Sequence, residues 1–192
     1  MSSLRLVFFS IVMLVYLWVP FSMITQQENV LKDGKTYLFQ TRPVDPYDAF
    51  RGRYVALSFI GNRIVNNANT ANFRQGETVY TSLELDSLGY AFFDQLYTSP
   101  PDHPNYIETK ITYVGKTHTT LEVPENLRRY YLNEKLAPLA EKAYRELNRR
   151  QQNDNGEVNA HLRVKVLNGK ILLEDLYLKG QPVGEYLKNE MK

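Results

Sequence analysis

An uncharged run near the N-terminus is the feature that most constrains how this chain folds. None of the 19 residues from Leu6 to Ile24 carries a charge. As an α-helix this run measures roughly 28 Å, close to the hydrocarbon thickness of a bilayer. It has no polar face at any helical phase, which disfavours the core helix of a soluble domain. The run therefore predicts a transmembrane helix that contacts the lipid bilayer through residues 6–24.

A cleaved signal peptide is the alternative interpretation of this run. Signal peptides have an apolar region of about 7–15 residues, followed by small residues at the cleavage site. Here the run is longer, and its exit from Pro20 to Thr25 lacks two small residues at that spacing. We therefore favour a retained anchor, and both interpretations export the rest of the chain.

The charges that flank the run predict its orientation. Only Arg5 and the free amino terminus precede it, whereas two lysines and two acidic residues follow within about ten positions. This asymmetry is small, but a long domain is translocated largely regardless of its charge. We expect a single-pass protein of the cytoplasmic membrane with its N-terminus inside. Residues 1–26 would form the cytoplasmic tip and anchor, and residues 27–192 one extracytoplasmic domain.

The composition of the exported part excludes several classes of function. Its length of roughly 165 residues suffices for one domain with an apolar core. The 23 Lys and Arg residues and 21 Asp and Glu residues of the chain are interspersed, so nucleic acid is not an expected partner. The chain has no cysteine, and its three histidines lack the short-spaced partners of a metal site. We therefore expect no metal and no cofactor, and no catalytic constellation is evident.

Outside the span, the apolar pattern mostly has the period of two that is typical of β-strands. Two segments are expected to be loops, the Asn-rich residues 62–75 and the Pro-rich residues 98–105. Asn168-Gly169 is a strong signal for a hairpin turn. The pattern predicts strands at residues 35–41, 51–60, 77–85, 89–96, 106–114, 117–123, 160–166 and 170–178.

One helix is expected among these strands. Six apolar residues repeat at steps of three and four, which is the period of a helix with one buried face: Leu136, Leu139, Ala140, Ala143, Tyr144 and Leu147. Asn133 can cap its start, and Pro138 can make its first turn irregular. The prediction is an α+β fold, with a mainly antiparallel, curved or barrel-like sheet, one covering helix and the N-terminal transmembrane helix.

Two carboxylates are candidates for a functional role on this helix. Glu134 and Glu141 are seven residues apart, so a helix would place both on one face, opposite the apolar stripe. Glu141 can also pair with Arg145 at a spacing of four. Two carboxylates about 10 Å apart along a helix make a poor acid/base pair, so we expect a solvated face.

Residues 45–59 contain a pattern that resembles a known family. The sequence there is Asp-Pro-Tyr-Asp-Ala-Phe-Arg-Gly-Arg-Tyr-Val-Ala-Leu-Ser-Phe. Gly52, Tyr54, Leu57 and Phe59 stand where the signature of the bacterial GDYXXLXY family has Gly, Tyr, Leu and Tyr. The family is membrane-associated and has no assigned chemistry, so the resemblance implies an architecture and a location. Arg53 stands where the signature has Asp, which reverses the charge and leaves any cation-binding role of that Asp unsupported here.

The resemblance extends over residues 25–185. The segment Arg129-Tyr-Tyr-Leu-Asn-Glu134, with Glu141 after it, is similar to the family's aromatic-then-acidic passage into its helix. Residues 176–182 are similar to its terminal strand. The resemblance also implies a partner, a multi-pass membrane protein, which the anchor would contact within the bilayer.

The signature strand offers a candidate binding rim. Alternation places Arg51 and Arg53 on one face with the larger apolar residues, and both guanidinium groups then lie where the strand enters the fold. The nearest carboxylates in the sequence are Asp45 and Asp48. Either these charges lock the turn as salt bridges, or the arginines and Tyr54 bind an anionic group such as a phosphate, a carboxylate or a lipid headgroup.

Two functions from different classes follow. The first is a non-catalytic, membrane-anchored extracytoplasmic domain that acts through a membrane-protein partner. The alternative is an envelope ligand-binding or hydrolytic domain that uses the Arg, Asp and Tyr rim. The absence of a catalytic motif and the apolar anchor favour the first.

Overall fold

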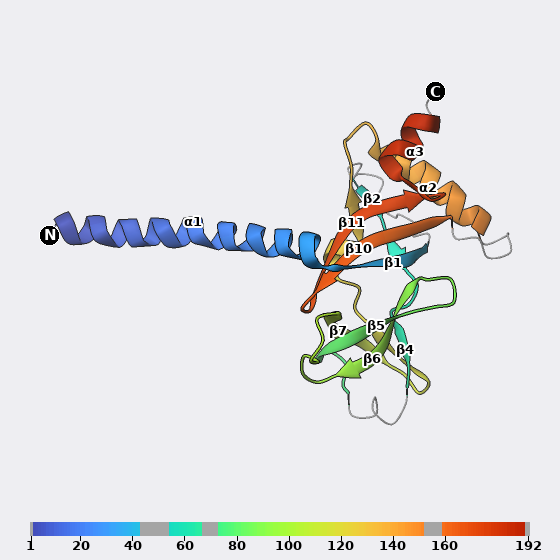
Figure 1. Ribbon diagram of the computed structural model, residues 1–192, viewed down its shortest axis with the longest axis horizontal. Helices are drawn as coiled ribbons and strands as arrows, with labels where there is room; N and C mark the ends of the chain where they lie inside the picture. The colour runs from blue at the N-terminus through green and yellow to red at the C-terminus, as the bar shows by residue number, and fades with distance from the viewer. Residues whose placement is uncertain (1, 43–53, 67–72, 152–158, 191–192) are drawn as a thin grey trace.

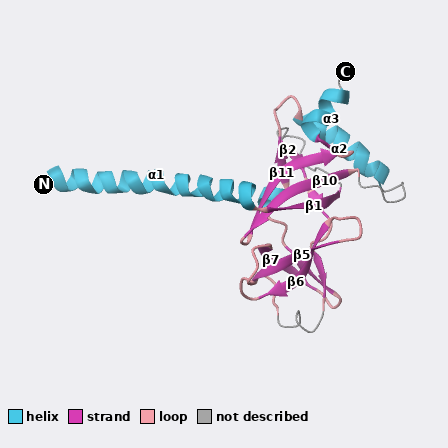
Figure 2. Cartoon of the chain, in the orientation of Figure 1, coloured by secondary structure: helices cyan, strands magenta, loops and turns pink. Residues whose placement is uncertain are grey.

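The computed structural model describes residues 2–42, 54–66, 73–151 and 159–190. A long helix, α1 (Ser2–Asp33), extends away from a folded domain that contains all the other elements (Figure 1). The domain consists mainly of strands, with helices at one end (Figure 2). The structure is thus the predicted α+β fold preceded by an apolar helix.

Helix α1 has the length and composition needed to cross a membrane. From Leu6 to Asp33 its most apolar window has a mean hydropathy of 2.2, and none of that window is buried by the domain. Residue 26, where we expect the anchor to end, lies inside the helix, which continues to Asp33. A signal sequence has the same apolar character near the N-terminus, so retention of the anchor stays a prediction.

The first sheet is antiparallel and has the order β12-β11-β10-β1-β3. Strand β10 shows a strict alternation in which every second residue is buried, as expected for a strand with one face on the core. Asn168 and Gly169 both have positive φ, 47° and 80°, which confirms the predicted two-residue hairpin turn. The strands are β1 (Lys35–Arg42), β3 (Ser58–Phe59), β10 (Ala160–Leu167), β11 (Lys170–Leu178) and β12 (Gln181–Pro182).

The second sheet, also antiparallel, has the order β4-β8-β7-β5-β6. It curves strongly, and the backbone N–H of Phe93 in β6 donates to the carbonyl oxygen of Gly61, just before β4, at 2.9 Å. The described strands do not close into a barrel, but the predicted curvature and the hairpins β5–β6 and β7–β8 are confirmed. The strands are β4 (Arg63–Val65), β5 (Thr78–Leu85), β6 (Ala91–Tyr97), β7 (Tyr106–Val114) and β8 (His118–Leu121).

The signature segment does not form the single strand that we predict for residues 51–60. In its described part, β2 (Tyr54–Ala56) pairs with β9 (Arg129–Tyr131), whereas β3 pairs with β1. The change occurs at Leu57, whose N–H donates to the carbonyl oxygen of Arg128 at 2.8 Å. An alternating pattern indicates which face of a strand is buried, but not which strand lies beside it. The change of partner from β9 to β1 could therefore not be predicted from the sequence.

Two helices cover one end of the domain. Helix α2 (Ala137–Gln151) confirms the predicted helix, and the Asn133 side-chain oxygen accepts the Lys135 N–H at 3.0 Å in the turn before it. The expectation that Glu134 and Glu141 share a helical face is wrong, because the helix begins after Glu134. Short elements escaped prediction: η1 (Glu125–Leu127), β9, α3 (Val183–Glu190), and β4 within the segment expected to be a loop.

A single apolar core joins the two large sheets and the covering helices. Phe39 of β1 and Phe93 of β6 meet within it, with ring centroids 6.1 Å apart in an edge-to-face arrangement. Phe39 is fully buried and Phe93 is 1 % exposed. Tyr144 of α2 is 1 % exposed and closes the core from the helical side.

Candidate functional site

The predicted binding rim is described only in part. The structure describes Tyr54 and Leu57 completely and Phe59 by its backbone. The other predicted residues lie outside the described part of the chain: Asp45, Asp48, Arg51, Gly52 and Arg53. Both interpretations of the two arginines, a salt bridge that locks the turn and a site for an anion, therefore stay predictions.

The pairing of β2 with β9 places the signature tyrosine in a surface cluster. Tyr54 lies directly opposite Tyr131, with ring centroids 5.9 Å apart. The guanidinium carbon of Arg129 lies 5.4 Å from the centroid of the Tyr54 ring, within the range of a cation–π contact. We call Tyr54, Arg129 and Tyr131 the aromatic–arginine cluster. The family signature contains Tyr54, but no local pattern in the sequence identifies Arg129 as its partner.

The arginine of this cluster is charged, as arginines in proteins are. A hydrogen bond with Tyr131, aided by attraction from Tyr131 and Glu125, raises the pKa of Arg129 above its ordinary value despite some desolvation. The Glu125 carboxylate lies 3.4 Å from one guanidinium nitrogen. Because a guanidinium has five N–H donors in a planar fork, it can bind an anionic group while keeping these contacts. Tyr131 is 66 % exposed, so the cluster is accessible.

The inward-facing side chains of the signature segment pack in the apolar core. Val55 is fully buried and Leu57 is 4 % exposed, as the alternation predicts. Next to them, the Tyr130 hydroxyl donates to the Asp175 carboxylate at 2.6 Å and so joins β9 to β11. The backbone N–H of Leu176 donates to the same carboxylate at 2.8 Å. Three separated segments that carry the resemblance thus meet in one region of the fold.

The model of the family described as GDYXXLXY protein matches residues 16–176. This chain belongs to the GDYXXLXY family. No curated protein and no solved structure matches the chain. The matched range includes the end of the apolar run, the signature and β9, so the family match covers the second part of the apolar helix and most of the domain.

The partly buried hydrogen bond between Tyr130 and Asp175 in this GDYXXLXY protein leads to a prediction about pH. Burial, and then the hydrogen bond to Asp175, raise the pKa of the Tyr130 hydroxyl well above its ordinary value of about 10. Its stabilising contribution is therefore complete below pH 10 and is lost as the pH rises further. Tyr130→Phe is expected to lower the free energy of unfolding by about 1 kcal/mol at pH 7. Urea denaturation of the full chain in mild detergent, repeated from pH 7 to 11, measures this difference.

The wild type should lose its advantage over Tyr130→Phe only above about pH 10. Tyr131→Phe, which alters the exposed neighbour on the same strand, serves as a control for general alkaline destabilisation. An advantage that stays constant up to pH 11 would contradict the assignment of the hydrogen-bonded tyrosine.

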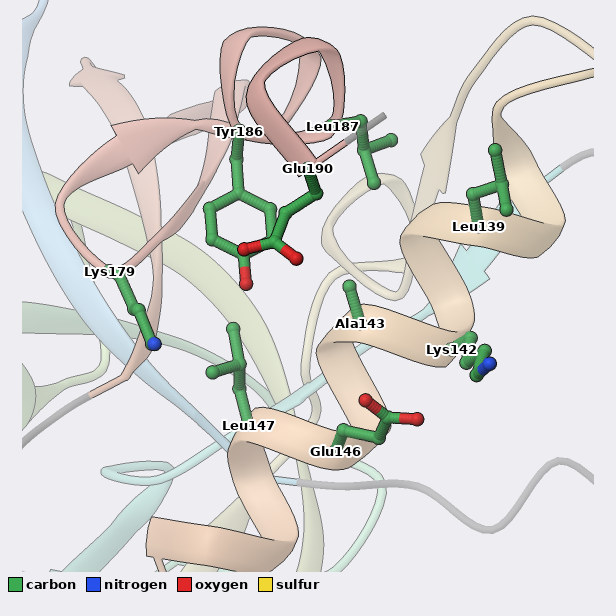
Figure 3. Close-up of a pocket in the computed structure, with 9 residues that line it drawn as sticks. All are labelled: Leu139, Lys142, Ala143, Glu146, Leu147, Lys179, Tyr186, Leu187 and Glu190. Atoms are coloured by element: carbon green, nitrogen blue, oxygen red, sulfur yellow. The ribbon is translucent and has the colours of Figure 1, made fainter. Parts of the chain in front are cut away.

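A cleft lies between α2 and α3. Its volume is about 320 Å³, and Figure 3 shows Ala143 and Leu147 of α2 facing α3 across it. The four charged side chains that line it are two lysines and two glutamates: Lys142, Glu146, Lys179 and Glu190. Because the lining has as many positive as negative side chains, the cleft does not favour anionic over cationic ligands. The lining residues also include no nucleophile paired with a general base.

The two acidic candidates lie on different parts of the chain, one in α2 and one before it. Glu141 lies 3.0 Å from Arg145, which confirms the pair at a spacing of four, and Glu134 lies in the turn before α2. Within the described residues, no group of three or more His, Asp or Glu side chains could hold a metal ion.

Proposed function

We propose that this GDYXXLXY protein is a membrane-anchored domain that stands outside the cytoplasm and acts through a multi-pass membrane protein. The apolar helix carries this proposal. From Leu6 to Ile24 its large apolar side chains expose between 47 % and 80 % of their surface, on all sides of the helix. The domain covers none of them, so lipid, or a partner helix within the lipid, would have to.

The junction between helix and domain supports a mechanical role for such a contact. Helix α1 enters β1 through Gly34 alone, and Val30 in its last turn is 2 % exposed against the domain. A Cβ at Gly34 would lie 2.3 Å from the carbonyl oxygen of Val30 and 3.2 Å from that of Val166. Because no flexible linker separates the two parts, a partner that moves the span would also move the domain.

Three measurements test this function. Protease added to intact spheroplasts should remove the domain, and the protein extracted from membranes should have the full mass of 22.4 kDa. Replacing residues 6–24 by a neutral Leu/Ala helix should keep the protein in the membrane but abolish recovery of the partner in a detergent pull-down. Complete protection of the domain would refute the orientation, and undiminished partner recovery would refute contact through the span.

The aromatic–arginine cluster favours a second candidate, the binding of an anionic envelope ligand. Its guanidinium lies at the surface beside the signature tyrosine, in the region where we predict the rim. Arg129→Gln should weaken binding of an anionic probe such as inorganic phosphate about tenfold, whereas Arg145→Gln on α2 should not. Equal affinities for the two variants would remove this candidate.

A further inference from the structure

A cleft opens where α1 meets the domain. Its volume is about 330 Å³. The helix contributes Met23, Gln26 and Gln27, and the domain contributes residues of β7 and η1 and the start of β11. None of these side chains belongs to the aromatic–arginine cluster or to the cleft between α2 and α3.

The walls of this cleft are fixed relative to each other. The Lys170 ammonium at the start of β11 donates to the side-chain oxygen of Gln26 on α1. On the domain side, the N–H of Gly169 donates to the Tyr106 carbonyl oxygen at 3.2 Å, and the N–H of Glu108 donates to the Gly169 carbonyl oxygen at 3.0 Å. These contacts join the β10–β11 turn to both the helix and the second sheet, so the cleft is part of the folded structure.

The position of the cleft along α1 places it at the membrane surface. Met23 lies within the uncharged run, and Gln26 follows the last residue of that run, Ile24, by two positions. At 1.5 Å per residue this is about 3 Å along the helix axis. If the run spans the hydrocarbon, the ammonium of Lys170 lies at the level of the lipid headgroups.

Charged side chains of both signs line the cleft. Lys170 has three N–H donors and uses one on Gln26, which leaves donors for phosphate oxygens. Glu108 lines the same cleft, is exposed, and forms no ion pair with any described residue. It also lines an adjoining cleft of about 390 Å³ that contains no residue of α1. Lys110 lines that cleft too, and its other two carboxylates, Glu122 and Glu125, form ion pairs with Arg128 and Arg129. The cation of this groove that is held beside the span is therefore Lys170, and its unpaired carboxylate is Glu108, where the groove continues away from α1.

We propose that this groove binds the zwitterionic headgroup of a phosphatidylethanolamine-type lipid. In such a lipid the phosphate is next to the glycerol and the ammonium is outermost, which matches the order of charges from Lys170 to Glu108. Lys170 binds the phosphate, Glu108 binds the ammonium, and Met23 contacts the top of the acyl region. This inference rests on the membrane span of the proposed function but not on its protein partner.

Binding of short-chain lipids to the full chain in nonionic micelles tests the assignment. Calorimetric titration with dihexanoyl phosphatidylethanolamine should give a dissociation constant about tenfold lower than with the phosphatidylglycerol analogue. Lys170→Met should weaken binding of both lipids about tenfold. Glu108→Gln should abolish the preference between them and leave phosphatidylglycerol binding intact. Lys142→Met and Glu146→Gln, on exposed positions of α2, are the matched controls and should change neither value.

Each alternative outcome overturns a defined part of the inference. Equal affinities of the wild type for the two lipids, or unchanged binding by Lys170→Met, exclude the headgroup site. Competition by inorganic phosphate at the affinity of the lipid would assign the groove to free phosphate instead. If Lys170→Met loses its tertiary circular dichroism, Lys170→Arg must keep the binding and Glu108→Gln must still lose the preference. Failure of the wild type to float with vesicles would overturn the proposed function as well, whereas flotation without headgroup preference would overturn this inference alone.

Discussion

The double variant Leu14→Asp/Val15→Asp is expected to leave the membrane. Both residues lie near the middle of the uncharged run and are 67 % and 58 % exposed on α1, so the domain cannot shield them from lipid. An aspartate at the centre of a membrane helix costs about 2.5–3.5 kcal/mol, so two cost roughly 6 kcal/mol. The span should then no longer insert stably.

Extraction at alkaline pH followed by vesicle flotation measures this effect. The wild type should float and the double variant should stay at the bottom of the gradient. Leu14→Ile/Val15→Leu keeps the apolar character at the same two positions and should float like the wild type. Recovery of the Asp variant in the floated fraction would show that residues 6–24 do not attach the protein to the membrane.

The Phe39→Ala variant is expected to lose 3–5 kcal/mol of stability, a large part of the roughly 5–15 kcal/mol available to a domain of this size. Phe39 has no exposed surface, and its ring meets Phe93 of the second sheet edge to face. Truncation removes apolar contact and leaves a cavity where β1 adjoins β6, because the surrounding strands are hydrogen-bonded and can collapse only in part. The two sheets should therefore be weakened together.

Urea denaturation of the full chain in mild detergent measures this loss. Thr36→Ala, at an exposed position of the same strand, should change the free energy of unfolding by less than about 0.5 kcal/mol. A double-mutant cycle with Phe93→Ala should give a coupling of about 0.5–1.5 kcal/mol for the aromatic pair. A loss below about 1 kcal/mol for Phe39→Ala would mean that the core does not join the sheets through this residue.

Local patterns in the sequence were sufficient to predict the elements that depend on interactions between residues close together in the chain. The uncharged run from Leu6 predicts α1, since only an apolar environment suits a helix without a polar face. Asn168 and Gly169 predict the β10–β11 hairpin, because a primed turn requires two residues with positive φ. Steps of three and four predict α2. The family signature also identified Tyr54 as a candidate site residue.

The strand pairing and the two candidate sites depend on contacts between segments that are distant in the chain. Nothing near Leu57 in the sequence shows that the strand changes its neighbour from β9 to β1, because strand pairing joins residues that are remote in the chain. For the same reason Arg129 became the partner of Tyr54 only in the folded domain. The groove beside Lys170 likewise exists only because the β10–β11 turn, β7 and the end of α1 pack together. Alternation in a sequence identifies buried faces, whereas a site built across elements depends on which of those elements become neighbours.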